Sequence, residues 1–200
     1  MCPHRARATG ETLAERGVHF IDAPVSGGPA GARAQRLYVF MGGEAGVVEA
    51  VRPIIEAVAG PHYITHCGPI GSGQIAKGVN QLMMALANAA ALEAIAFGVN
   101  NGLAPELIAR AIGETDPLRQ SIAAIARAIA AGESNTIDYK FRELPYFLDD
   151  ARENGFSLPL TEALHDFCAP GERVTILDKR PAPGFWHELT AAMKKFTPEA

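Results

Sequence analysis

One stretch near the middle of the chain constrains the fold most: a glycine-rich turn that runs directly into a long apolar helix. The turn covers residues 66–73, with the sequence HCGPIGSG, and most of residues 73–99 are Ala, Leu, Ile, Val, Met or Phe. A helix of this composition is expected to be largely buried. Because a lysine is among the side chains least often buried without a partner, Lys77 on this helix requires an explanation.

Polar side chains surround Lys77 at helical spacing. Gln74 lies three positions before it, and Asn80 and Gln81 lie three and four positions after it. Side chains at these spacings share one face of a helix. The pattern predicts an amine and several amides at the mouth of a cleft, although a lysine that extends to solvent from a helix start would fit it as well.

Hydrophobic periodicity predicts strands in the first third of the chain and helices in the rest. Residues 1–10 are polar and without periodicity, so we expect them to be frayed, and a short helix should follow at 11–16. The predicted strands are residues 18–23, 36–41 and 62–66. The predicted helices are residues 44–58, 73–101, 105–112, 118–131, 137–154, 160–168 and 185–195.

Charge and cysteine content exclude several classes of function. Lysine and arginine number 18 against 22 acidic residues, a net charge of −4, so no nucleic-acid partner is expected. Three separated cysteines and histidines without ligand spacing predict neither a disulfide framework nor a metal site. The apolar run at 82–97 is shorter than the roughly 20 residues that span a bilayer. We therefore expect a cytoplasmic protein without membrane contact.

Three motifs, in this order, resemble the β-hydroxyacid dehydrogenases. They are residues 22–28 (DAPVSGG), 41–43 (MGG) and 68–81 (GPIGSGQIAKGVNQ), and the resemblance extends from about Thr12 to about Cys168. Typical members of the family are 3-hydroxyisobutyrate dehydrogenase and tartronate semialdehyde reductase. The resemblance implies an NAD(P)-binding Rossmann domain, a long interdomain helix and an all-helical domain similar to the C-terminal domain of 6-phosphogluconate dehydrogenase.

Applied to this chain, the resemblance implies two domains of unequal completeness. Residues 1–68 would be an α/β remnant, the second half of a Rossmann domain, and residues 69–200 the all-α domain. The family begins with a Gly-x-Gly-x-x-Gly turn that holds the cofactor pyrophosphate. Residues 68–73 have a different glycine order. We therefore expect an N-terminally truncated member in which NAD or NADP binding, implied by the resemblance, is weak for the chain alone.

The loop after the first motif is expected to bind the substrate carboxylate. By resemblance, Ser26, Gly27 and Gly28 are the residues that hold it. Backbone N–H groups exposed by adjacent glycines suit an anion, which agrees with this assignment. From the residues alone, an ordinary turn is the alternative.

Residues on the long helix are expected to carry the chemistry. By resemblance, Lys77 is the general acid/base, and Asn80 and Gln81 orient the substrate. A lysine partly withdrawn from water suits proton transfer to or from a hydroxyl group. The 6-phosphogluconate dehydrogenases place a histidine beside the asparagine, and here the neighbours are Val79 and Gln81, which favours the hydroxyacid branch. Arg142 stands where the family has a lysine near the nicotinamide, so a cofactor contact is expected there.

Two functions from different classes fit these observations. The first is an NAD(P)-dependent oxidoreductase of small 3-hydroxy acids, similar to 3-hydroxyisobutyrate dehydrogenase. The second is a non-catalytic truncated paralogue, a helical dimerisation module without cofactor. Both predict a homo-oligomer formed through the helical domain, and only the first predicts turnover that depends on Lys77.

Overall fold

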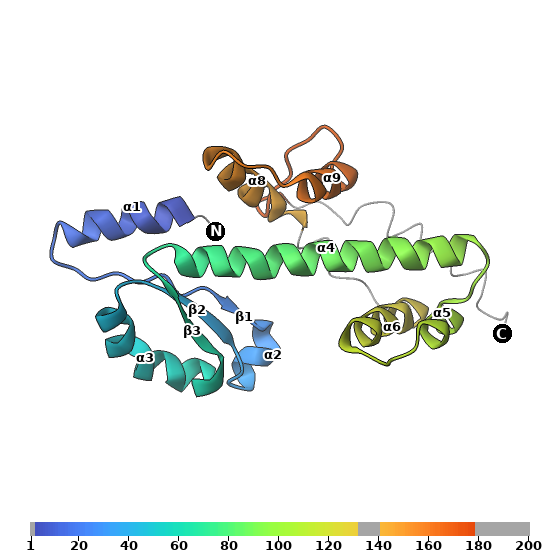
Figure 1. The fold of residues 1–200 in the computed structure, drawn as a ribbon, viewed down its shortest axis with the longest axis horizontal. Coiled ribbons are helices and arrows are strands. Elements are labelled where there is room, and N and C mark those ends of the chain that lie inside the picture. Colours follow the sequence, from blue (N-terminus) through green and yellow to red (C-terminus); the bar gives the residue numbers. More distant parts are fainter. Residues whose placement is uncertain (1–2, 132–140, 179–200) are drawn as a thin grey trace. The chain divides into compact units, whose positions relative to one another are not determined.

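The computed structural model describes residues 3–131 and 141–178, and these form two compact units (Figure 1). Unit 1 comprises Met1–Leu82 together with Asp149–Phe156, and unit 2 comprises Met83–Leu148 and the chain from Ser157 onward. The division falls inside the long helix α4, Ser72–Asn100, so this helix belongs to both units. The predicted helix at 185–195 and the start of the one at 137–154 lie outside the described residues.

Unit 1 contains a three-stranded sheet in the order β1-β2-β3. Strands β2 (Tyr38–Gly42) and β3 (Ile64–Gly68) are parallel, and β1 (Val25–Ser26) pairs antiparallel with β2. Helix α3 (Ala45–Ala59) and the short 3-10 helix η1 (Pro61–Tyr63) connect the parallel pair. A parallel pair needs such a crossover, and α3 packs its apolar face on the sheet. The buried residues of this layer are Leu37, Val39, Met41, Val48 and Ala59.

The N-terminal part of unit 1 differs from the sequence-based expectation. Residues predicted to be frayed form helix α1, Pro3–Ala14, which buries the small residues Ala6 and Gly10. The predicted strand at 18–23 is wrong, since within it only Asp22 forms a bridge, to Gly42. The chain pairs with β2 later, at β1, and then forms the short helix α2, Gly28–Arg33. Of the apolar residues in the predicted strand, Ile21 and Ala23 pack against the core without regular pairing, whereas Val18 is exposed.

The regular secondary structure in the described part of unit 2 consists of helices. It contains the second part of α4, then α5 (Pro105–Ile112), α6 (Pro117–Ala130), the start of α8 (Leu144–Glu153) and α9 (Pro159–Cys168). Asp116 caps α6, since its carboxylate accepts the Arg119 N–H over 3.0 Å. A buried cluster joins α4, α5 and α6 through Leu92, Ile95, Ala96, Val99, Ile108, Ala109, Ala123, Ala126 and Ile129.

Helix α4 as a whole is long and apolar enough to cross a bilayer, although the apolar run at 82–97 within it is shorter. Its 29 residues include an 18-residue window of mean hydropathy 1.8, so by length and composition it could cross a bilayer. The expectation that no segment is long enough is wrong on this criterion. The core helix of a globular protein has the same properties, and α4 fully buries Leu92 and Ile95 in the cluster of unit 2. The absence of a membrane contact stays a prediction.

Candidate active site

Lys77 lies in the second turn of α4 and is 7% exposed. Its Nζ donates a hydrogen bond to Gln81 Oε1 over 3.0 Å, one helical turn further on. The i to i+4 spacing that the sequence predicted to share a face therefore does so. The buried amine is held by an amide oxygen, a suitable acceptor for an ammonium group, which carries three donor protons.

Asn80 connects this pair to the strand region. Its Nδ2 donates to Ser26 Oγ over 3.2 Å and to Gln81 Oε1 over 3.2 Å. Gln81 Oε1 is therefore a shared acceptor for Lys77 and Asn80. Ser26, Lys77, Asn80 and Gln81 form one hydrogen-bonded group within unit 1, three of them from α4 and one from β1.

The turn after Ser26 requires glycine. Gly27 has φ +129°, and Gly28, the first residue of α2, has φ +58°. Side chains other than glycine are strained at such angles. Both glycines are exposed, so their backbone is accessible beside Ser26. An amine, a hydroxyl, two amides and an open glycine turn together can hold a small molecule that carries a carboxylate and a hydroxyl group.

Sequence reasoning missed one buried polar residue next to this group. Asp22 is 4% exposed, and its two carboxylate oxygens accept the N–H groups of Gly71 over 2.6 Å and Gln74 over 2.8 Å. A cavity of about 460 Å³ adjoins it, lined by Pro24 and Gln74 among others. The aspartate stands inside the first motif, but nothing local in the sequence indicates its partners, which lie 49 and 52 positions away.

Arg142 belongs to unit 2. Its guanidinium donates to the backbone carbonyl of Asp178 over 2.9 Å, within the same unit. The expected cofactor contact of this residue stays a prediction.

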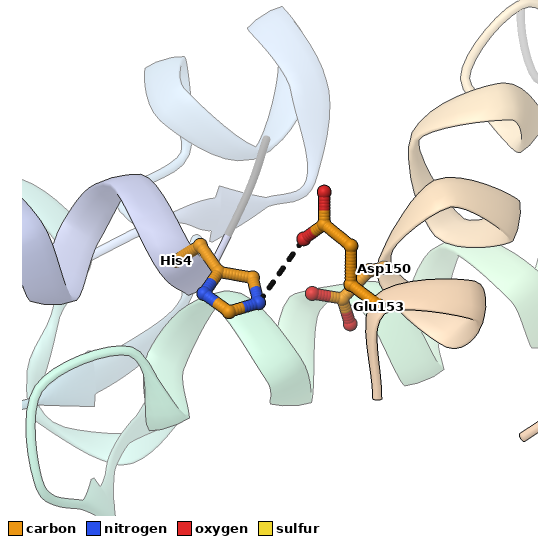
Figure 2. A group of neighbouring side chains, drawn as sticks. All are labelled: His4, Asp150 and Glu153. Carbon is orange, nitrogen blue, oxygen red and sulfur yellow. Dashed lines mark ion pairs between the residues drawn. The ribbon is translucent and has the colours of Figure 1, made fainter. Parts of the chain in front are cut away.

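A group of possible metal-ligating atoms lies elsewhere in unit 1. Figure 2 shows His4 of α1 near Asp150 and Glu153 of α8, with ligand atoms within 4.8 Å of one another. His4 Nε2 lies 3.1 Å from Glu153 Oε2, and both side chains are about half exposed. Exposed pairs of this kind contribute about 0–1 kcal/mol and are common on proteins that bind no metal. We interpret the contact as a surface ion pair.

The two cysteines in the described residues are not activated as nucleophiles. Burial raises the pKa of the Cys168 thiol to about 12. Burial, and to a lesser degree the Asp22 carboxylate, also raises the pKa of the Cys67 thiol. Because the thiolate is the reactive form, covalent catalysis by these residues is disfavoured.

Two family profiles match the chain in succession. Residues 1–68 match the NAD binding domain of 6-phosphogluconate dehydrogenase. Residues 71–175 match the profile described as NAD-binding of NADP-dependent 3-hydroxyisobutyrate dehydrogenase, which covers more than half of the chain. The chain belongs to the β-hydroxyacid dehydrogenase family. The resemblance inferred from the three motifs is thereby confirmed.

Two named dehydrogenases share substantial identity with the chain. NAD-dependent L-serine dehydrogenase of Pseudomonas aeruginosa is 42% identical over 109 residues, 54% of this chain and 36% of the relative. 2-(Hydroxymethyl)glutarate dehydrogenase of Eubacterium barkeri is 31% identical over 155 residues, 76% of this chain and 51% of the relative. The chain thus spans about a third to a half of the length of these relatives.

Solved structures agree on the fold. A 3-hydroxyisobutyrate dehydrogenase from Salmonella typhimurium matches with a TM-score of 0.67 at 22% identity, over 83% of this chain and 59% of that one. A Mycobacterium tuberculosis 3-hydroxyisobutyrate dehydrogenase, described with L-serine, matches with a TM-score of 0.66 at 25% identity, over 98% and 67% of the chains. The prediction of a Rossmann remnant followed by an all-α domain is confirmed.

The residues present do not supply the whole cofactor site of the β-hydroxyacid dehydrogenases. The family binds NAD or NADP, but no Gly-x-Gly-x-x-Gly turn occurs among the 200 residues. In unit 1, the Gly68–Gly73 stretch links β3 to α4, where its Gly71 N–H is bound to Asp22. These residues therefore lack the pyrophosphate-binding turn of the family.

Proposed function

We propose that this chain carries the substrate-binding and proton-transfer half of an NAD(P)-dependent oxidoreductase of small 3-hydroxy acids. The observation that carries the proposal is the hydrogen-bonded group of Ser26, Lys77, Asn80 and Gln81. Relatives named for L-serine and 3-hydroxyisobutyrate indicate the substrate class. Both molecules carry a carboxylate and a hydroxyl group on a short chain, which the group of donors suits.

The substrate carboxylate binds at the Ser26–Gly28 turn in this proposal. Ser26 Oγ offers a hydroxyl, and the backbone N–H groups of Gly27 and Gly28 stand next to it. Backbone N–H groups in a turn with positive φ form a concave anion site. Because α2 begins at Gly28, the turn also precedes a helix, although that helix has only six residues.

Lys77 Nζ exchanges a proton with the substrate hydroxyl oxygen. Oxidation of the alcohol needs a base for the hydroxyl proton, and reduction of the carbonyl needs an acid. The nicotinamide that accepts or returns hydride supplies the redox chemistry of the family. Gln81 Oε1 accepts a hydrogen bond from Nζ. Asn80, which is hydrogen-bonded to Ser26 and Gln81, orients the substrate in this proposal.

Turnover by the purified chain tests this proposal. NAD⁺ or NADP⁺ is added with 3-hydroxyisobutyrate or L-serine, and nicotinamide reduction is followed by absorbance. The proposal predicts slow turnover that Lys77→Ala lowers by about 10²–10⁴-fold, the usual contribution of a general acid/base. Arg142→Lys serves as the companion variant, since it restores the residue that the family carries at that position.

Equal turnover by the wild-type chain and Lys77→Ala would show that the amine is not the acid/base. Absence of turnover, of nicotinamide binding and of hydroxy-acid binding in a folded chain would favour the non-catalytic alternative. That alternative predicts self-association through apolar residues of α4. Ile75 and Val79, one turn apart on α4, are 46% and 63% exposed, and sedimentation of the chain would detect a homo-oligomer.

A further inference from the structure

A buried carboxylate joins the chain before β1 to the start of α4. Asp22 Oδ1 accepts the Gly71 N–H over 2.6 Å, and Oδ2 accepts the Gln74 N–H over 2.8 Å. The first N–H groups of a helix have no partner within the helix, and a negative charge there is favoured by the helix dipole. Asp22 therefore satisfies two of these donors at the start of a helix of 29 residues.

Asp22 is also held through its backbone. The Asp22 backbone exchanges two hydrogen bonds with Gly42 of β2, at 2.9 and 2.7 Å. A Cβ at Gly42 would collide with Asp22 Oδ1, and a Cβ at Gly73 would lie 2.7 Å from Oδ2. The backbone at Gly42 and Gly73 thus approaches the carboxylate closely on these two sides.

Together with the Ser26–Asn80 contact, this contact flanks Lys77 on both sides along α4. Asp22 holds α4 at Gln74, and Ser26, four positions after Asp22, holds α4 at Asn80 through its hydroxyl. Lys77 lies midway between these two attachments, three positions from each. A movement of the first turn of α4 would therefore displace Lys77 and Asn80 relative to Ser26.

We propose that Asp22 is a positioning residue: its carboxylate fixes the first turn of α4 against the Asp22–Ser26 segment and so sets where Lys77 and Asn80 stand relative to Ser26. Its significance for catalysis rests on the proposed function, whereas the positioning itself concerns the chain without ligand. Asp22 does not touch the reacting atoms in this account. It acts through the backbone of α4.

Asp22→Asn is the most informative variant. It keeps the size of the side chain but replaces one carboxylate oxygen by an NH₂ group, which cannot accept a backbone N–H. Asp22→Glu keeps the charge but moves the carboxylate one methylene further from the backbone, away from the positions that accept the two N–H groups, so it should not restore the wild-type behaviour. Val48→Ala is the matched control, because Val48 is fully buried in the sheet layer of unit 1 and its side chain has no hydrogen-bonding atom.

The readout is the NMR spectrum of the chain with its lysines ¹³C-methylated, in which Lys77→Arg identifies the Lys77 signal. We expect Asp22→Asn to move the Lys77 signal and to weaken hydroxy-acid binding about tenfold or more, with helix content retained by circular dichroism. Val48→Ala should lower the unfolding temperature without either effect. If Asp22→Asn leaves the Lys77 signal in place, or if Val48→Ala moves it equally, the proposal is overturned.

Two further results keep the test decisive. If the wild-type chain binds no hydroxy acid, the proposed function fails, but the Lys77 signal still decides whether Asp22 positions the helix. If Asp22→Asn does not fold, amide exchange of the wild-type chain replaces it. The Gly71 and Gln74 protons should then exchange far more slowly than those of an open turn, and rapid exchange of both would overturn the proposal.

Discussion

Asn80 of α4 donates a hydrogen bond to Ser26 Oγ of β1 over 3.2 Å and so joins two residues 54 positions apart. Through the shared acceptor Gln81 Oε1, the same asparagine is connected to Lys77. Strand β1, which precedes the glycine turn, is therefore hydrogen-bonded directly to helix α4, which carries the amine.

The Ser26–Asn80 contact should be measurable as a coupling energy. Ser26→Ala and Asn80→Ala each remove it, so the double variant should be less destabilised than the sum of the single variants by about 1 kcal/mol, the net value of an ordinary hydrogen bond. Urea unfolding of the four proteins gives the cycle. Strict additivity would mean that the two side chains do not interact in solution.

The glycine turn should tolerate substitution unequally at its two positions. Gly27 has φ +129°, and an added Cβ would lie 3.2 Å from Leu37 Cδ2 and 3.3 Å from the Arg36 carbonyl oxygen. Gly28 has φ +58° and open space around its Cβ position. Gly27→Ala should cost about 1–3 kcal/mol, whereas Gly28→Asn should cost less, because asparagine adopts left-handed backbone most readily.

Thermal or urea unfolding measures both variants, and hydroxy-acid affinity can be followed in parallel. A larger loss of stability for Gly28→Asn than for Gly27→Ala would contradict the described turn.

The reactivity of Cys168 should follow its burial. Since burial raises the pKa of this thiol to about 12, its thiolate fraction near pH 8 is about a thousandfold below that of an ordinary cysteine. Alkylation of Cys168 in a chain with the other two cysteines replaced by serine should be correspondingly slow, and urea should restore the ordinary rate. The neutral thiol is favoured in the folded state, so stability is retained below the unfolded pKa and lost as pH rises toward 12.

A fast reaction of Cys168 in the folded chain would show that the end of α9 is open to solvent.

The loss of stability on truncating a side chain of α4 in unit 2 should depend on how deeply that side chain is buried. Ile95 is 0% exposed within the cluster of α4, α5 and α6, whereas Phe97, two positions later, is 75% exposed. Ile95→Ala should lower the free energy of unfolding of unit 2 by about 2–5 kcal/mol, and Phe97→Ala, although it removes a larger side chain, by less than about 0.5 kcal/mol. Helix content followed during urea unfolding reports both, and equal costs would contradict this packing.

Features that depend on near neighbours in the sequence were predictable. The predicted helix at 105–112 is confirmed at the same bounds as α5, and α4 begins and ends within one residue of its prediction. The shared face of Lys77 and Gln81 also follows from helical spacing alone. These features involve residues three or four positions apart, where the geometry of the helix fixes the contact.

Features that depend on distant contacts were not predictable from periodicity. Valine is a residue type that favours strands, yet Val18 is 49% exposed. In this part of the chain, the pairing with β2 is confined to Asp22 and to β1. Helix α1 buries small residues such as Ala6 and Gly10, which produce no apolar period. Asp22 carries no local sign of its role. The resemblance to a family suggested that Ser26 and Asn80 share a site, and only the fold places them in contact.

Binding of 3-hydroxyisobutyrate to the purified chain, measured by calorimetry, tests the central claim most directly. The account predicts saturable binding to the wild-type chain that Ser26→Ala and Lys77→Ala each weaken about tenfold or more, a loss of at least about 1.4 kcal/mol. Glu153→Ala, at the exposed ion pair with His4, should leave the affinity unchanged. Binding of equal strength in all four proteins would contradict a site built from Ser26 and Lys77.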